Sequence, residues 1–251
     1  MFLLAAPALA IDFDFPKDTS FAPENWLEDP IAINITPIAA EDKTPASDII
    51  SKAILKYPDD FLETRLSRIL VVAKLECYGA AFGGTYLANN RAIVITYRGA
   101  MNKASFEGRI HHEISSLMLE SNRDLFHVER WQRALPVDFA YDTDKVIEQS
   151  ATSATAGVEK LQSTESPQSL LTGTTDLRKL GFLNRYSTTS IEQDFNEVAA
   201  ALFTDKQIWM HAAGSANLAQ KVDVLIDFYR AVDPRFDRIF FHRLTQPLPK
   251  Q

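Results

Sequence analysis

Two segments rich in β-branched residues most constrain the fold of this chain. They are residues 69–79, ILVVAKLECYG, and residues 91–98, RAIVITYR. Glycine and asparagine residues between them mark turns, and β-branched segments bounded by such residues are typical of strands. The sequence therefore predicts two neighbouring strands of an antiparallel sheet.

Helical periodicity surrounds these strands. Apolar residues recur at helical spacing in residues 46–57, which lie between Pro45 and Pro58, and a second helical stretch is expected over residues 59–70. A helix is also expected over residues 105–125. Three further helical segments are predicted in the C-terminal part, at residues 191–205, 216–232 and 234–244. This order of elements predicts an α+β fold, with a small antiparallel or mixed sheet packed on the helix of residues 105–125.

Three remaining segments are expected to lie outside the core. Residues 1–10, MFLLAAPALA, end in an A-L-A that resembles a signal peptidase site, so they are interpreted as the remnant of an export signal. An apolar N-terminal arm of a cytoplasmic protein is the alternative. Residues 11–45 alternate acidic residues with prolines and are predicted to form an extended arm. Residues 150–175 hold eleven Ser or Thr and are predicted to form a loop of the single domain that covers residues 46–251.

Composition and charge exclude several classes of protein. The net charge is -7, and no dense cluster of Lys and Arg interleaved with aromatics is present, so nucleic acid is not expected as a partner. The single cysteine, Cys77, rules out an intramolecular disulfide framework and a cysteine-rich zinc knuckle. No apolar run after residue 10 approaches the ~18 residues of a membrane span. The expected location is the periplasm or the cell exterior.

The segment RIHHEISSL in the helix of residues 105–125 contains half of a zinc motif. In an H-E-x-x-H helix, two histidines coordinate zinc from one face, and the glutamate takes a proton from the metal-bound water. His112 fits the first ligand and Glu113 fits the base, whereas Ser116 stands where the second histidine belongs. His111 is a neighbouring donor, but on a regular helix it points about 100° away from His112.

The same segment also has a structural interpretation. Arg109 lies four residues before Glu113 and is able to pair with it on the helix surface. A histidine on a helix is more often a hydrogen-bonded structural residue than a metal ligand. Half of an H-E-x-x-H motif is therefore weak evidence for a metal site.

Three longer segments strengthen the metal hypothesis. They are FGGTYLANNRAIVITYR, FEGRIHHEISSLML and GFLNRYSTTSIEQDFNEVAAALFTD, and together they resemble bacterial zinc-binding metallopeptidases of the gluzincin kind, over residues 46–244. The resemblance implies a zincin-like fold, with a strand that lies antiparallel to the substrate and a later glutamate as the third zinc ligand. By its place in DFNEVAA, Glu197 would be that ligand, preceded by Asn196. Ser116 departs from the pattern.

Two residues flank the segment that carries Glu197. Tyr186 and His211 are predicted to orient the substrate or to stabilise an oxyanion, although both residue types commonly occupy half-buried structural positions. Glu197 itself has an alternative as a solvated residue beside the apolar stripe of its helix. The sequence contains neither a G-x-S-x-G nucleophile elbow nor a phosphate-binding loop.

The leading hypothesis is a zinc-dependent peptidase that hydrolyses peptide bonds through a metal-activated water. Its Zn²⁺ ligands would be His112 and Glu197, with the position of Ser116 filled by water, by His111 or by another residue, and the catalytic residues would be Glu113, Tyr186 and His211. We expect His112, Ser116 and Glu197 to converge in one cleft beside an antiparallel strand at residues 91–98. The alternative is a catalytically inactive metallopeptidase-like protein that binds a peptide or protein partner. A structural envelope protein is a third possibility.

Overall fold

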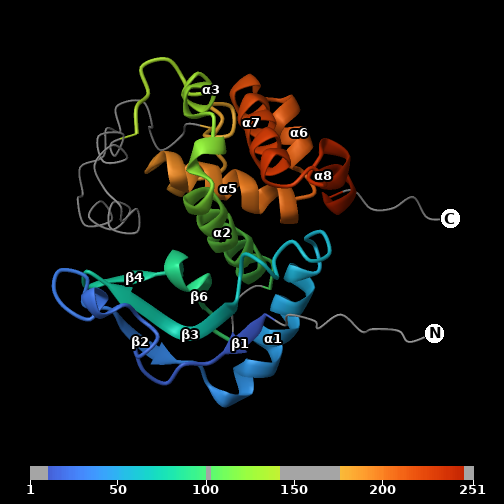
Figure 1. Ribbon diagram of the computed structural model, residues 1–251. Coiled ribbons are helices and arrows are strands. Elements are labelled where there is room, and N and C mark those ends of the chain that lie inside the picture. The colour runs from blue at the N-terminus through green and yellow to red at the C-terminus, as the bar shows by residue number, and fades with distance from the viewer. Residues whose placement is uncertain (1–10, 100–102, 142–175, 246–251) are drawn as a thin grey trace, which may run out of the picture.

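The computed structural model describes residues 11–99, 103–141 and 176–245 (Figure 1). Residues 1–10 and the Ser/Thr-rich segment at about 150–175 lie outside these ranges, so the expectations for them stay predictions. A long helix, α2 (Lys103–Ser121), runs through the middle of the molecule, with a sheet on one side and the C-terminal helices on the other. The predicted α+β class is confirmed.

The remaining elements divide between these two layers. The strands are β1 (Asp12–Asp14), β2 (Asn34–Pro37), β3 (Arg68–Cys77), β4 (Ala80–Phe82), β5 (Gly84–Leu87) and β6 (Ala92–Thr96). The other helices are α1 (Ala40–Ile54), α3 (Val128–Gln132), α5 (Ile191–Thr204), α6 (Ile208–Ala213), α7 (Ala216–Val232) and α8 (Arg238–Thr245). None of the helices in the described ranges is long and apolar enough to cross a membrane.

The sheet has six strands and is mixed. Its main order is β1-β3-β6-β5, with β2 and β4 also paired to β3. The two strands predicted from sequence are neighbours, β3 and β6, but they run parallel, so the antiparallel pairing predicted for them is wrong. The chain reverses direction at Gly79, where φ is 72°, and again at Arg91, where φ is 46°. After two reversals the chain runs in its original direction, and β4 and β5 lie between the two reversals in sequence.

The N-terminal segment takes part in the sheet. Strand β1 pairs in parallel with β3, and β2 pairs with β3 in the antiparallel sense. Helix α1 begins at Ala40 and contains Pro45, which the sequence analysis placed before the helix. Its buried residues, among them Ala46 and Ile50, pack against the core. The stabilisation from this packing exceeds the cost of the backbone hydrogen bond that the proline removes.

The helix predicted over residues 59–70 is not formed. Residues 59–65 are turns, and Asp60 has a φ of 64°, which is incompatible with a right-handed helix. The apolar residues that suggested a helix are nevertheless buried, because Phe61, Leu62 and Leu66 belong to the core. Burial of an apolar cluster therefore occurs here without helical structure.

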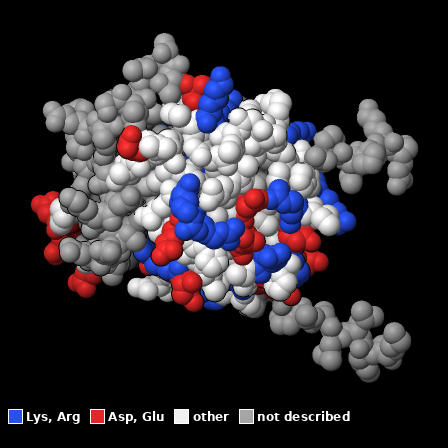
Figure 2. Space-filling view, turned by 90° about the horizontal axis from the view of Figure 1, so that it is seen from above, with Lys and Arg blue, Asp and Glu red and all other residues white. Residues whose placement is uncertain are grey.

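Charges of both signs mix on the molecular surface. Figure 2 shows Lys and Arg side chains interspersed with Asp and Glu on the face that it presents. Ion pairs contribute to this mixture, such as Arg130–Asp227 at 2.8 Å. Nucleic-acid binding surfaces concentrate positive charge instead. This face therefore offers no support for a nucleic-acid partner, and the expectation that there is none stays a prediction.

A buried ion pair joins the C-terminal helices. Lys221 on α7 lies 2.6 Å from Asp194 on α5, and both side chains have 0% exposure. The Asp194 carboxylate also accepts hydrogen bonds from Trp131, at 3.2 Å, and from the Tyr141 hydroxyl. Lys221 donates a further hydrogen bond to the Gly181 carbonyl at 2.9 Å. One polar centre thus ties α3, α5, α7 and two connecting segments together.

Removing one member of this pair is expected to destabilise the protein strongly. Lys221→Met leaves the Asp194 carboxylate buried without its counter-ion, so the free energy of unfolding should fall by about 3–5 kcal/mol. Urea denaturation followed by circular dichroism measures this change. As a control, the double variant Lys221→Met/Asp194→Asn should lose less than the single variant. A loss of less than about 0.5 kcal/mol in Lys221→Met would contradict the assigned role.

Candidate functional site

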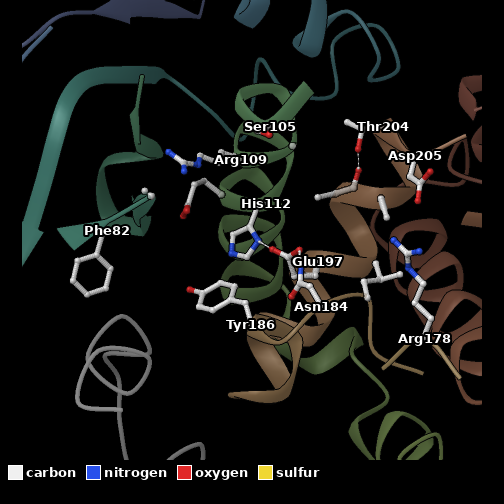
Figure 3. Close-up of a pocket in the computed structure, with 17 residues that line it drawn as sticks. Phe82, Ser105, Arg109, His112, Arg178, Asn184, Tyr186, Glu197, Thr204 and Asp205 are labelled. Carbon is white, nitrogen blue, oxygen red and sulfur yellow. Dashed lines mark hydrogen bonds and ion pairs between the residues drawn. The ribbon is translucent and has the colours of Figure 1, made fainter. Parts of the chain in front are cut away.

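A cleft of about 490 Å³ opens between α2, α5 and the edge of the sheet (Figure 3). Helix α2 contributes Ser105, Gly108, Arg109, His112 and Glu113 to its lining. The β4–β5 corner supplies Phe82, Gly83 and Gly84, and the segment before α5 supplies Arg178, Asn184 and Tyr186. The cleft therefore lies where the two layers of the fold meet.

His112 and Glu197 face each other across this cleft. The His112 Nδ1 lies 3.1 Å from Glu197 Oε1, and the second carboxylate oxygen accepts a hydrogen bond of 2.5 Å from Asn184 (Figure 3). Burial alone would lower the pKa of His112, but the hydrogen bond with Glu197 and the nearby carboxylates outweigh it and raise that pKa. The ring of Tyr186 stacks on His112 at 5.9 Å between centroids. The imidazole is therefore held on two sides.

Ser116 lies below the cleft, in the contact between α2 and α5. Its side chain is buried, and its hydroxyl oxygen accepts a hydrogen bond of 2.6 Å from Asn196 Nδ2. Asn196 precedes Glu197, so the two residues bond to α2 one helical turn apart, at Ser116 and His112. His112, Ser116 and Glu197 thus gather at one junction, although the serine is not part of the cleft lining.

Glu113 points from α2 toward the sheet edge. A Cβ atom added at Gly84 would lie 2.6 Å from Glu113 Oε1, so the carboxylate occupies the space that a side chain on β5 would need. Burial raises the pKa of the Glu113 carboxyl to about 7. The strand beside the site is therefore β5, and not the strand predicted at residues 91–98, because β6 lies one position further into the sheet.

His111 lies on another face of α2 from His112. It has 0% exposure, its ring stacks on Phe203 at 4.7 Å, and its Nδ1 lies 3.0 Å from the Tyr57 hydroxyl. Burial raises the pKa of Tyr57, so the hydroxyl keeps its proton beside the imidazole. His111 is a core residue that does not reach the cleft, and the idea that it replaces the missing ligand has no geometric support.

His211 lies on α6, outside the cleft lining. Its Nε2 is 3.9 Å from Asp205, a residue at the rim of the cleft. The structure therefore brings Tyr186, but not His211, into contact with His112.

The described residues do not fit a zinc site. A catalytic zinc has three protein ligands. Within residues 11–99, 103–141 and 176–245, no group of three or more His, Cys, Asp or Glu side chains is placed to hold a metal ion. Only His112 and Glu197 converge, and they bond to each other, while the Ser116 hydroxyl is occupied by Asn196. The positions expected to bind metal are instead joined by hydrogen bonds.

Several residues at the site were missed by the sequence analysis. Asn184 binds Glu197 from a segment that precedes α5, and no local pattern marks it. Arg109 was expected to pair with Glu113, but its Nη1 donates to Thr96 Oγ1 at 2.7 Å. The glycines of FGGTY were noted as turn residues, and their actual significance is the space that they leave for Arg109 and Glu113.

Comparisons with known proteins identify no family. No model of a known protein family matches the chain, and no curated protein matches it. Among solved structures, the chain is similar to one described as "a putative zinc-binding metallo-peptidase" from Bacteroides caccae. The two share 13% sequence identity, the match covers 94% of this chain and 85% of that one, and the TM-score is 0.49. A similarity of this degree establishes no activity.

Stability should depend on pH through His111. Burial lowers the pKa of this imidazole from 6.5 to about 4, although its contact with Glu107 opposes the shift. Between these pH values the unfolded chain binds a proton that the folded chain does not, so stability is intact above pH 6.5 and is lost on acidification. The His111→Gln variant lacks this titration. Relative to the variant, the wild type should lose about 2 kcal/mol between pH 7.5 and pH 5, measured by urea denaturation. A constant difference would show that His111 is not buried as described.

Restoring the missing histidine should not restore a metal site. In Ser116→His, an imidazole must enter the buried space beside Asn196, and overpacking of this kind costs about 1–3 kcal/mol. The melting temperature should fall, and zinc should not raise it again. Ser116→Ala is the matched control, because it removes the hydrogen bond without adding volume. Tight zinc binding by Ser116→His in calorimetry, with a higher melting temperature in zinc, would instead reveal a zinc-binding geometry that lacks only one ligand.

Proposed function

We propose that this protein is a non-catalytic, metallopeptidase-like protein that binds an extended peptide segment in the cleft between α2, α5 and β5. One observation carries the proposal: the positions expected to bind zinc are closed by the hydrogen bonds His112–Glu197 and Ser116–Asn196, while the cleft beside them stays open. We also propose that it acts in the periplasm or outside the cell, on the basis of residues 1–10.

The edge of the sheet supports recognition of a peptide backbone. Strand β5 ends the order β1-β3-β6-β5 and pairs with β6 alone in the described sheet. Thr96 N–H donates to the Gly83 carbonyl at 2.9 Å, so in the alternating pattern of an antiparallel pair the next residue, Gly84, turns its backbone groups away from β6. An extended peptide is able to add to such an edge through main-chain hydrogen bonds.

The shape and chemistry of the cleft also suit a peptide. A volume of about 490 Å³ lies in the range of small-molecule sites and accommodates a few side chains. Its walls combine small residues, such as Gly108 and Ala201, with the polar groups of Arg109 and Asn184 and the ring of Tyr186. A Cβ added at Gly108 would meet no atom within 4 Å, so this part of the α2 wall is open space.

A zinc-dependent peptidase is the second candidate, and one observation favours it. Burial raises the pKa of Glu113 to about 7, and a carboxyl that titrates near neutral pH suits general-base catalysis. The donor set counts against it, because two converging ligands do not make a zinc site. Cleavage of peptides in the presence of added zinc would support this candidate over the first.

Filling the cleft from α2 should abolish peptide binding. The probe is a random pool of dodecapeptides displayed on phage and selected on the immobilised full chain. Peptides that the wild type enriches should bind Gly108→Leu at least about tenfold more weakly, because the new side chain occupies the open wall. Fluorescence anisotropy of the synthetic peptides measures the affinities. Peptides N-methylated at alternate backbone positions should also bind more weakly, since methylation removes the N–H groups that pair with a strand edge.

Gly108→Ala is the matched control. It adds one methyl group, raises helix propensity and leaves most of the open space unfilled, so it should keep peptide binding and remain at least as stable as the wild type. The proposal fails if no peptide is enriched, or if Gly108→Leu binds the enriched peptides as tightly as Gly108→Ala does. Mass spectrometry of the peptides after incubation with and without zinc tests for cleavage in the same samples.

A further inference from the structure

Arg109 is a cleft residue whose guanidinium is held, among the described residues, through one of its nitrogen atoms, Nη1. Its Nη1 donates hydrogen bonds to Thr96 Oγ1, at 2.7 Å, and to the Thr96 carbonyl, at 3.4 Å. The Thr96 hydroxyl donates in turn to the Gly83 carbonyl at 2.9 Å. Arg109 is thereby fastened to the β4–β5 corner, and Figure 3 shows it extending from α2 toward the strands, away from the His112–Glu197 pair.

The opposite edge of this guanidinium carries the Nε and Nη2 donors. In the described ranges both hydrogen bonds of Arg109 come from Nη1, so no acceptor is placed there for Nε or Nη2, and no ion pair joins Arg109 to a carboxylate. Gly83 packs on the face of the guanidinium: a Cβ added there would lie 3.4 Å from Arg109 Nε, 3.6 Å from Cζ and 3.7 Å from Cδ. The lack of a side chain at Gly83 therefore lets the guanidinium lie flat against the β4–β5 corner, which fixes the direction of its two parallel N–H donors.

Among the described residues, the charges that act on Arg109 are those of Arg98 and Glu113. Burial lowers the pKa of Arg109, and the nearby charge of Arg98 lowers it further. Glu113 acts in the opposite direction, but its carboxylate lies beneath Gly84 and not within ion-pair distance of Arg109. A half-buried cation that is already oriented loses little conformational freedom when it binds an anion.

We propose that Arg109 selects bound peptides that carry a carboxylate at the β4–β5 end of the cleft. A carboxylate matches the Nε–Nη2 edge, because its two oxygens accept two parallel hydrogen bonds. An Asp or Glu side chain and a free C-terminus share this chemistry, and both sources are included in the test. The inference rests on the proposed peptide-binding function and adds the class of peptide to it.

The test uses fluorescein-labelled pools of ten-residue peptides, degenerate except at one central position, which is Glu, Gln or Lys. Each pool is made with a free C-terminal carboxylate and with a C-terminal amide. In fluorescence anisotropy, the wild type should bind the Glu pool about tenfold more tightly than the Gln pool, or the free-acid pools more tightly than the amides. The first result identifies a side-chain carboxylate as the ligand, and the second identifies the C-terminus.

Two variants of Arg109 separate selection from a structural role. Arg109→Gln should abolish the preference between the Glu and Gln pools, or between acid and amide. Arg109→Glu should reverse it in favour of the Lys pool. A purely structural role predicts that Arg109→Gln weakens binding of every pool by the same factor, with the ratio between pools unchanged, and that result would overturn the inference.

Two further variants serve as controls. Arg133→Gln removes the same charge from an exposed position outside the cleft lining, so the ratio between pools should stay within about twofold of the wild-type ratio. Gly83→Val places atoms against the face of the Arg109 guanidinium without changing any charge, so it should displace this group and reduce the preference for the carboxylate. If the wild type binds all pools equally, the carboxylate inference is wrong while peptide binding stands. If it binds none of them, the proposed function fails and the inference fails with it.

Discussion

The contact between α2 and α5 is the constraint on which the site depends. The two helices come from segments 85 residues apart at His112 and Glu197, and small or polar residues let them approach closely. One turn of α5 bonds to one turn of α2 twice, through Asn196 to Ser116 and through Glu197 to His112. In a zinc peptidase a metal would join such helices. Here direct hydrogen bonds join the two helices.

The architecture was largely predictable from periodicity, and the errors in that prediction have local causes. Helices α5 and α7 have apolar faces at regular spacing, and the structure contains them within a residue or two of the predicted bounds. The direction of β6 relative to β3 was not predictable, because it depends on two reversals, one of which occurs at Arg91, a non-glycine residue with positive φ. The start of α1 was also predicted wrongly, because Pro45 lies inside this helix and does not precede it. In α1, tertiary burial outweighed the local signal of the proline.

The site was predictable only in part. The resemblance placed Glu197 near His112, and their side chains do meet, while the roles predicted for them stay predictions. What sequence could not supply were partners from other elements. Asn184, in a connecting segment, donates a hydrogen bond to Glu197. Arg109 donates to Thr96 on β6 and not to Glu113. A helical wheel shows which residues share a face, but it does not show what another element offers to them.

The glycine at position 84 links the acidity of one helix residue to the backbone of a strand. With no Cβ at Gly84, β5 lies close against the Glu113 carboxylate, and the burial of this carboxylate raises its pKa to about 7. A larger residue at position 84 would displace this carboxylate, because a Cβ there would lie 2.6 Å from Glu113 Oε1. The position of the carboxylate that ionises near neutral pH, that of Glu113, therefore depends on Gly84 of β5, which lies 29 positions earlier in the chain.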